Sequence, residues 1–340
     1  MNVGRDEFSL IRQWTKPSLQ DKGDGLVVGI GDDAAVFAVS AGREVVACCD
    51  AMIETVHFLK STMNPADIGY KAMISNISDI AAMGGIPRFS LVTIGVSPNW
   101  TPDECQQIYD GMYEACRDYG VRIIGGDTVS APDAMHLSVT LLGEVESGKA
   151  LLRRSARPGD AVFVTGTVGG SAAGLHALFQ ARDTGEPVLA KWQQLITFHQ
   201  RPAAQVQAGR LLLSHPGMGA CNDVSDGLAS ELWEVAEASG VTIHIDQERI
   251  PIHPDVRGFA RQEDRDPYQW AFFGGEDYQL TGTVAQEHAE ALQRLFEENG
   301  LSVTLIGRVE AGEGPNLLMT DTYGTTQVLH KAGYNHFSQS

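Results

Sequence analysis

The chain has 340 residues, a length that predicts two domains, and 43% of them are hydrophobic, as in an ordinary globular protein. Its 43 acidic side chains outnumber 25 basic ones, giving a formal charge of −18 without any Lys/Arg cluster, which argues against nucleic acid and anionic membranes as partners. The sequence has no bilayer-length apolar run, no secretory-type start and no Cys-x-x-Cys pair, so we expect a cytoplasmic protein with reduced thiols.

The first half of the chain is predicted to alternate strands and helices. One helix is expected over 66–83, because Asn64-Pro65 is typical of a helix start and two glycines follow its end. A second helix is expected to begin after Thr101, in a capping-box pattern, and to end at Gly120. The strand-like runs of this half are 26–30, 35–39, 44–49, 89–96, 121–124 and 137–145.

A polar, turn-forming stretch at 153–160, RRSARPGD, is the best candidate for a domain boundary. We therefore expect an N-terminal domain over 1–150 and a C-terminal domain over 151–340. The elements expected in the second domain are strands at 161–165, 241–245, 278–284 and 301–309, a glycine-rich turn at 166–170, and helices from 171, over 227–238 and over 285–298. The pattern predicts a mixed α/β fold in both domains and leaves the strand order open.

Aspartates recur at the ends of these predicted elements, each beside glycine or another small residue. Any one of them is an ordinary turn or cap residue, but their recurrence indicates oxygen ligands for Mg²⁺ rather than a zinc site. The chain lacks the P-loop, dinucleotide, zincin and hydrolase-elbow motifs. The aspartates concerned are Asp33, Asp50, Asp79, Asp127, Asp223 and Asp226.

Three of these aspartates differ in how well a purely structural role would explain them. Asp79 falls in the last turns of its predicted helix among apolar neighbours, where the helix dipole disfavours a negative charge and a metal would stabilise it. Asp127 follows two glycines, which allow backbone to approach a phosphate closely. Asp226 would serve as the N-cap of helix 227–238 whatever the protein did, and His57 is structural on spacing alone.

Nine sequence blocks, in order along nearly the whole chain, closely resemble the bacterial thiamine-monophosphate kinase family. They are GIGDDAAV (29–36), CCDAMIETVHF (48–58), PADIGYKAMISNISDIAAMGGIPR (65–88), IIGGDT (123–128), ALLRRSARPGD (150–160), VTGTVGGSAAGL (164–175), DVSDGL (223–228), GGEDYQL (274–280) and GYNHF (333–337). The resemblance implies a two-domain aminoimidazole ribonucleotide synthetase-like fold and a homodimer in which the N-terminal sheets form a barrel. It also implies ATP held by several Mg²⁺ ions instead of a P-loop.

The resemblance also implies a role for individual residues. The metal ligands would be the six aspartates, Asp33, Asp50, Asp79, Asp127, Asp223 and Asp226, with a backbone oxygen of Cys48 or Cys49. The ATP-binding residues would be Tyr109, Gly126, Asp127, Arg153 and Ser225, and those facing thiamine monophosphate would be His57, Glu276 and Tyr334. Asp79, Asp127 and Arg153 would be catalytic. The chain departs from the family where Cys48-Cys49 replaces small hydroxyl residues and where Asn335 replaces an acid.

The implied activity is the ATP-dependent phosphorylation of thiamine monophosphate to thiamine diphosphate by direct in-line transfer. The acceptor is itself a phosphate, largely dianionic at neutral pH, so no general base is needed. Two alternatives remain open from the sequence. One is another ATP-using member of the superfamily, such as a purine-pathway synthetase or selenophosphate synthetase. The other is a non-catalytic sensor of thiamine phosphates and nucleotide.

Overall fold

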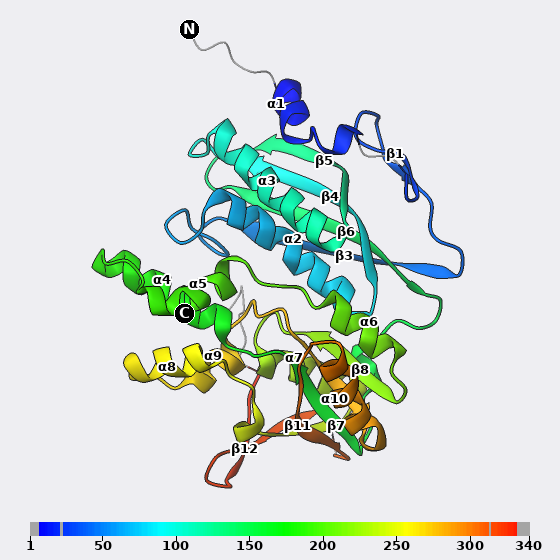
Figure 1. Ribbon diagram of the computed structural model, residues 1–340, viewed down its shortest axis with the longest axis vertical. Coiled ribbons are helices and arrows are strands. Elements are labelled where there is room, and N and C mark those ends of the chain that lie inside the picture. Colours follow the sequence, from blue (N-terminus) through cyan, green and yellow to red (C-terminus); the bar gives the residue numbers. More distant parts are fainter. Residues whose placement is uncertain (1–6, 21–22, 313, 332–340) are drawn as a thin grey trace. The chain divides into compact units, whose positions relative to one another are not determined.

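The computed structural model describes residues 7–20, 23–312 and 314–331 (Figure 1). The chain divides into two compact units, which we describe separately. Unit 1 comprises Met1–Ile80 and Gly85–Gly148, and unit 2 comprises Ala81–Gly84 and Lys149–Ser340. In the part of the chain that is described, no helix is both long and apolar enough to cross a membrane.

Unit 1 is built on a four-stranded sheet with the strand order β3-β6-β4-β5. Only the pair β4 and β5 is parallel, and the other neighbours are antiparallel. The strands are β3 (Arg43–Ile53), β4 (Ile86–Val96), β5 (Arg122–Ser130) and β6 (His136–Glu146). The N-terminal segment adds the helix α1 (Glu7–Trp14), the short 3-10 helix η1 (Ser18–Gln20) and a hairpin of β1 (Leu26–Val28) with β2 (Val36–Phe37).

Helices α2 (Pro65–Ala82) and α3 (Pro102–Tyr119) lie side by side over one face of this sheet (Figure 1). Both confirm the predicted boundaries. The Thr101 side chain accepts from the backbone N–H of Glu104, whose own side chain accepts from Thr101 N–H, so the capping box is present. Gly120 then ends α3 in the left-handed conformation.

Helices α2 and α3 cross backbone against backbone, through one glycine on each. A Cβ atom on Gly69 would lie 1.9 Å from the carbonyl oxygen of Ile108, and one on Gly111 would lie 1.8 Å from that of Ala66. No side chain can be accommodated at either position without moving a helix. The crossing therefore fixes the distance between the two helices.

Unit 2 contains a seven-stranded sheet with the order β13-β12-β9-β11-β7-β10-β8. The pair β9 and β12 is parallel, and the other neighbours are antiparallel. The strands are β7 (Asp160–Thr165), β8 (Met218–Asp223), β9 (Thr242–Asp246), β10 (Leu280–Ala285), β11 (Val303–Glu310), β12 (Asn316–Thr320) and β13 (Thr326–Val328). This order places β8, which ends at Asp223, at one edge.

Helices cover both faces of the unit 2 sheet, as the alternation along β7 shows. Val162 and Val164 pack in one cluster with α4 and α7, whereas Phe163 packs in another with α6 and α10. All six residues of β7 are buried, as expected of a strand covered on two sides. The helices are α4 (Gly170–Thr184), α5 (Gln193–Gln200), α6 (Val206–Ser214), α7 (Leu228–Ser239), α8 (Pro254–Gln262), α9 (Pro267–Phe273) and α10 (Ala289–Glu298). The mixed α/β class predicted from the sequence is confirmed.

Candidate active site

Unit 1 contains a cavity of about 710 Å³. Its walls come from the loop 29–35, from α1 and α3, and from strands β4, β5 and β6. Four of the predicted site residues line it together: Asp33, Tyr109, Gly126 and Asp127. Residues nearly a hundred positions apart in the sequence, Asp33 and Asp127, thus line one cavity.

Local backbone geometry explains why glycine and aspartate are needed beside this cavity. Gly126 has φ 150°, and a Cβ there would lie 1.8 Å from the carbonyl oxygen of Val92 on the neighbouring strand. One carboxylate oxygen of Asp127 accepts from the N–H of Thr128 at 2.9 Å. This bond orients the Asp127 side chain.

Tyr109, which also lines the cavity, is buried. Burial raises the pKa of its hydroxyl far above the ordinary value, so the hydroxyl stays neutral.

A second group of predicted site residues meets where β3 passes α2. The carboxyl of Asp50 is half-buried, and burial raises its pKa, although a Ser75 hydrogen bond and His57 act in the opposite direction. Burial, and then Asp79, raise the pKa of the neighbouring Cys48 thiol. The electrostatic environment of the Cys48 thiol, which stays neutral, therefore includes the carboxyl groups of both Asp79 and Asp50. Oxygen-rich sites of this kind suit a hard cation such as Mg²⁺.

His57 lies in the turn that leaves β3, and the structure fixes its tautomer. The ring Nδ1 of His57 accepts from the backbone N–H of Ile53 at 3.0 Å, and the backbone N–H of His57 donates to the Ile53 carbonyl at 2.9 Å. In the neutral ring the proton must then be on Nε2. His57 can therefore present an N–H donor at that nitrogen, which suits a phosphate oxygen.

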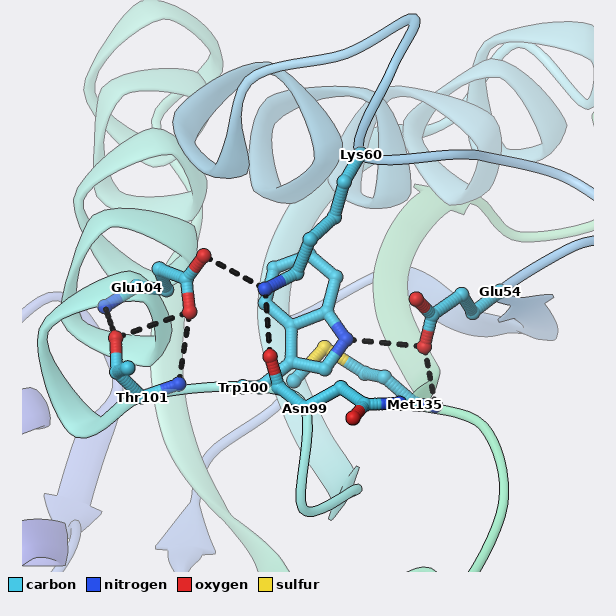
Figure 2. Close-up of polar contacts among 7 residues, drawn as sticks. All are labelled: Glu54, Lys60, Asn99, Trp100, Thr101, Glu104 and Met135. Carbon is cyan, nitrogen blue, oxygen red and sulfur yellow. Dashed lines mark hydrogen bonds and ion pairs between the residues drawn. The ribbon is translucent and has the colours of Figure 1, made fainter.

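The turn that carries His57 is tied to the start of α3 by the network in Figure 2. One carboxylate oxygen of Glu54 accepts from the indole N–H of Trp100 at 3.0 Å and from the N–H of Met135 at 2.9 Å. Lys60, at the other end of the turn, lies 4.0 Å above the Trp100 ring and contacts Glu104 at 2.6 Å. Trp100 thus holds both ends of the turn.

We predict that Trp100→Phe loosens this turn. Phenylalanine keeps an aromatic ring beneath Lys60 but loses the N–H that bonds Glu54, at a cost of about 1 kcal/mol. For a unit of this size the melting temperature is then expected to fall by about 2–4 °C. Calorimetry checks the stability, and the KM for the acceptor should rise if the turn positions His57. An unchanged melting temperature and KM would contradict the role assigned to Trp100.

In unit 2, two loops that are distant in the sequence run side by side and bring together Asp223, Ser225, Asp226 and Glu276. The N–H of Glu276 donates to the Ser225 carbonyl at 2.6 Å, and the N–H of Tyr278 donates to the Val224 carbonyl at 2.8 Å. Glu276 and Tyr278 have φ of 67° and 50°, a conformation that non-glycine residues rarely adopt. Strained backbone of this kind is common at functional sites.

Arg153 belongs to the same side of unit 2, and its guanidinium is held on two edges. Its Nε donates to the Oδ1 of Asn222 at 2.8 Å, and its Nη1 lies 2.7 Å from a carboxylate oxygen of Glu234. Asn222 precedes Asp223 at the end of β8. The predicted residues of unit 2 are therefore connected, with Tyr334 lying outside the described residues.

The structure corrects the structural alternative for Asp226. The N-cap of α7 is Gly227, with φ 99°, and no side chain caps the helix. The backbone N–H of Asp226 instead donates to the side chain of Glu231 at 3.0 Å. Asp226 is therefore one residue too early to cap α7.

The two adjacent cysteines point to opposite faces of the unit 1 sheet. The Cys48 thiol contacts the backbone oxygen of Asn76 in α2 at 3.3 Å. Cys49 is exposed, and its sulfur lies 3.5 Å from the hydroxyl of Ser138. Among the described residues, no three His, Cys, Asp or Glu side chains are gathered closely enough to hold a metal unaided.

Asp277, which the sequence analysis missed, is buried at the N-terminus of α4. Its two carboxylate oxygens accept from the N–H groups of Gly169 at 2.6 Å and Ser171 at 3.1 Å. The carboxylate thus satisfies helix N–H groups that would otherwise lack partners. It also anchors the loop between the strained residues Glu276 and Tyr278.

Burial raises the pKa of Asp277 to about 7 from an ordinary 3.8. A carboxyl whose folded pKa is raised stabilises the fold most at low pH, and this contribution is lost as the pH rises through about 7. We predict that wild type exceeds Asp277→Asn in melting temperature by more at pH 5 than at pH 8. Thermal melts of both proteins without ligands check this. A difference that is constant or grows with pH would contradict it.

Comparison with known proteins shows to which protein family this chain belongs. Residues 31–145 match the family described as AIR synthase related protein, N-terminal domain, and residues 157–319 match the corresponding C-terminal domain. The two matches cover most of the chain and confirm the two-domain AIR synthase-like fold. Fold and site thus define an enzyme of the AIR synthase related class.

Individual relatives narrow the class. The chain is 45% identical to thiamine-monophosphate kinase of Bacillus subtilis, over 98% of this chain and 99% of that one. The crystal structure of thiamine-monophosphate kinase from Stenotrophomonas maltophilia has a TM-score of 0.80 at 33% identity, over 93% of this chain and 96% of that one. AaThiL complexed with AMPPCP and TMP has a TM-score of 0.77 at 31% identity, over 99% and 100% of the chains. The chain belongs to the thiamine-monophosphate kinase family, which confirms the predicted resemblance.

Proposed function

We propose that the protein transfers a phosphoryl group from ATP to thiamine monophosphate, giving thiamine diphosphate and ADP. The observation that carries this proposal is the cavity of unit 1, where Asp33, Tyr109, Gly126 and Asp127 meet in a chain that matches the kinase family end to end. The relative that was complexed with AMPPCP and TMP supports the same pair of substrates. We place ATP in the N-terminal domain on this basis.

We propose Mg²⁺ as the cofactor, because the residues present fit it. The carboxyls of Asp79 and Asp50 both act on the Cys48 thiol, and Asp50 is itself partly desolvated, so a hard cation bound by these oxygen donors would stabilise them. When bound, Mg²⁺ supplies positive charge that offsets repulsion between the two polyanionic substrates. The proposed ligands are Asp33, Asp50, Asp79, Asp127, Asp223 and Asp226, with a backbone oxygen of Cys48 or Cys49.

The remaining residues are proposed to bind and orient the substrates. Arg153 would neutralise phosphate charge, and Ser225 would bond ATP from the adjacent loop. His57 would donate from Nε2 to the acceptor phosphate, and Glu276 would balance the cationic ring of thiamine. Tyr334 would stack on that ring. Since the acceptor phosphate is already an anion, the step is a direct in-line transfer that needs no general base.

We also propose that the protein forms a homodimer through unit 1. The face of β3 that does not contact α2 exposes Val45 and Ile53, and the hairpin nearby exposes Val27 and Val36. Exposed apolar side chains in such number on one unit are typical of an interface. Light scattering that gave a monomer at micromolar concentration would contradict the dimer.

We also propose a reducing compartment such as the cytoplasm. The five cysteines all lie within the described residues, and none of them forms a disulfide there.

Product analysis tests the proposed activity directly. The purified protein is incubated with ATP, Mg²⁺ and thiamine monophosphate, and the thiamine phosphates are separated by chromatography. We expect thiamine diphosphate and an equal amount of ADP, and no product in excess chelator until Mg²⁺ is restored. Turnover of an aminoimidazole precursor instead would favour the purine-pathway alternative. Binding of both ligands without any product would favour a sensor.

A further inference from the structure

Unit 2 contains a buried acid, Glu231, to which the proposed reaction assigns no role. It lies in the first turn of α7 and is 2% exposed. Its Oε2 accepts from the side-chain amide of Asn222 at 2.5 Å, and its Oε1 accepts from the N–H of Asp226 at 3.0 Å. The hydroxyl of Ser225 lies 3.4 Å from the same Oε1. Both oxygens of Glu231 therefore face donors.

The amide of Asn222 can adopt only one orientation in this network. The Nε of Arg153 can only donate, so the atom of Asn222 that faces it must be the oxygen, at 2.8 Å. The amide nitrogen must then face Glu231, which has to accept. Asn222 is itself 2% exposed, so water cannot replace either partner. The bond between the Arg153 Nε and Asn222 thus depends on an acceptor at Glu231, while Glu234 holds the Nη1 edge of the guanidinium.

We propose that Glu231 is a positioning residue that orients Arg153 through the amide of Asn222. The inference rests on the proposed function, in which Arg153 binds the phosphates of ATP. Glu231 touches neither substrate in this scheme. It determines instead which way a buried amide is turned, and so whether Arg153 is held at Nε.

The substitution Glu231→Gln tests this because it preserves size and removes one acceptor. The carboxamide has a single oxygen, which can serve either Asn222 or the N–H of Asp226. Its NH₂ group then faces a second donor. If the NH₂ group of the new carboxamide faces Asn222, the Asn222 amide must flip and present its own NH₂ group to Arg153. We expect the affinity for a non-hydrolysable ATP analogue to fall at least tenfold, with the KM for thiamine monophosphate nearly unchanged.

A second substitution should reverse the loss. In Asn222→Asp/Glu231→Gln the donor and the acceptor are exchanged: the new carboxylate accepts from both Arg153 and the carboxamide, whose oxygen still accepts from the N–H of Asp226. Arg153, the carboxamide and the N–H of Asp226 then each have an acceptor, and the formal net charge is that of wild type. We expect affinity for the analogue within threefold of wild type. Glu237→Gln, an exposed acid further along α7, is the matched control and should behave as wild type.

Failure of the double variant to bind better than Glu231→Gln would overturn the proposal, as would wild-type affinity in Glu231→Gln itself. Should Glu231→Gln not fold, Asn222→Ala carries the test: it removes the amide but leaves Glu231 bonded to Asp226. That variant should also lose at least tenfold in analogue affinity, and unchanged affinity would overturn the proposal. Binding is measured without turnover. A wild type that binds the analogue but makes no product would therefore contradict the proposed function and leave this test intact.

Discussion

Asp79→Asn is expected to reduce turnover by at least about 100-fold, the order seen when one preorganised electrostatic partner of a transition state is removed. The Asp79 carboxylate lies in the last turn of α2 beside Cys48, whose thiol also feels the charge of Asp50. Asparagine has the same shape but no charge, so cation binding should weaken while packing is retained. The measurement is kcat at saturating ATP and acceptor, over a series of Mg²⁺ concentrations.

The stability of the ligand-free Asp79→Asn protein, in contrast to its turnover, should not fall. A negative charge at the C-terminal end of a helix is unfavourable by about 0.3–1 kcal/mol. The ligand-free melting temperature of Asp79→Asn should therefore equal or slightly exceed that of wild type. Asp110→Asn, an exposed acid on α3, is the control and should leave both quantities unchanged. A folded Asp79→Asn protein with full activity would show that this acid is structural.

Arg153→Gln is expected to lower kcat/KM for ATP by about 100- to 1000-fold, because it removes the cation that would offset developing phosphate charge. Arg154→Gln is a matched control: the neighbouring residue has the same charge and is also exposed, and its removal should change little. Arg153→Lys should fall between the two, since lysine keeps the charge but not the Nε bond to Asn222. Equal effects of Arg153→Gln and Arg154→Gln would mean that only the general electrostatic field matters.

Helix α3 could be predicted from the sequence because both of its ends have strong local signals. Helix α3 has a complete capping box and a terminal glycine, and both are present in the structure. Helices α5 and α6 were missed, and neither has a side-chain cap. Helices α8 and α9 were also missed, although the side chains of His253 and Asp266 cap them and a proline begins each helix. Strand β8 was missed because its sequence, MGACND, has no alternation of apolar and polar residues. It acquires its place only by pairing with β10.

The site residues that could be predicted are those that a local sequence signal marks. The cavity residues Asp33 and Asp127 follow glycines and were predicted, since glycine next to an acid at a strand end is a local signal. Glu231 and Asp277 were missed, because an acid on a helix or in a turn ordinarily faces solvent. Their burial depends on distant partners. For Asp277 one signal existed: a glycine-rich turn opening a helix needs an anion, and a buried aspartate can supply it.

The glycine crossing of α2 and α3 limits how this enzyme can be stabilised by mutation. Replacing helical glycine by alanine is a standard choice in stabilisation campaigns, worth up to about 1 kcal/mol per site. Here the same change at Gly69 or Gly111 would force a methyl group into a carbonyl oxygen of the opposing helix. The displaced helices carry Asp79 and Tyr109, so the geometry of the proposed site would shift along with the backbone. Gly69 and Gly111 should therefore be kept as glycine when stabilising substitutions are chosen by helix propensity alone.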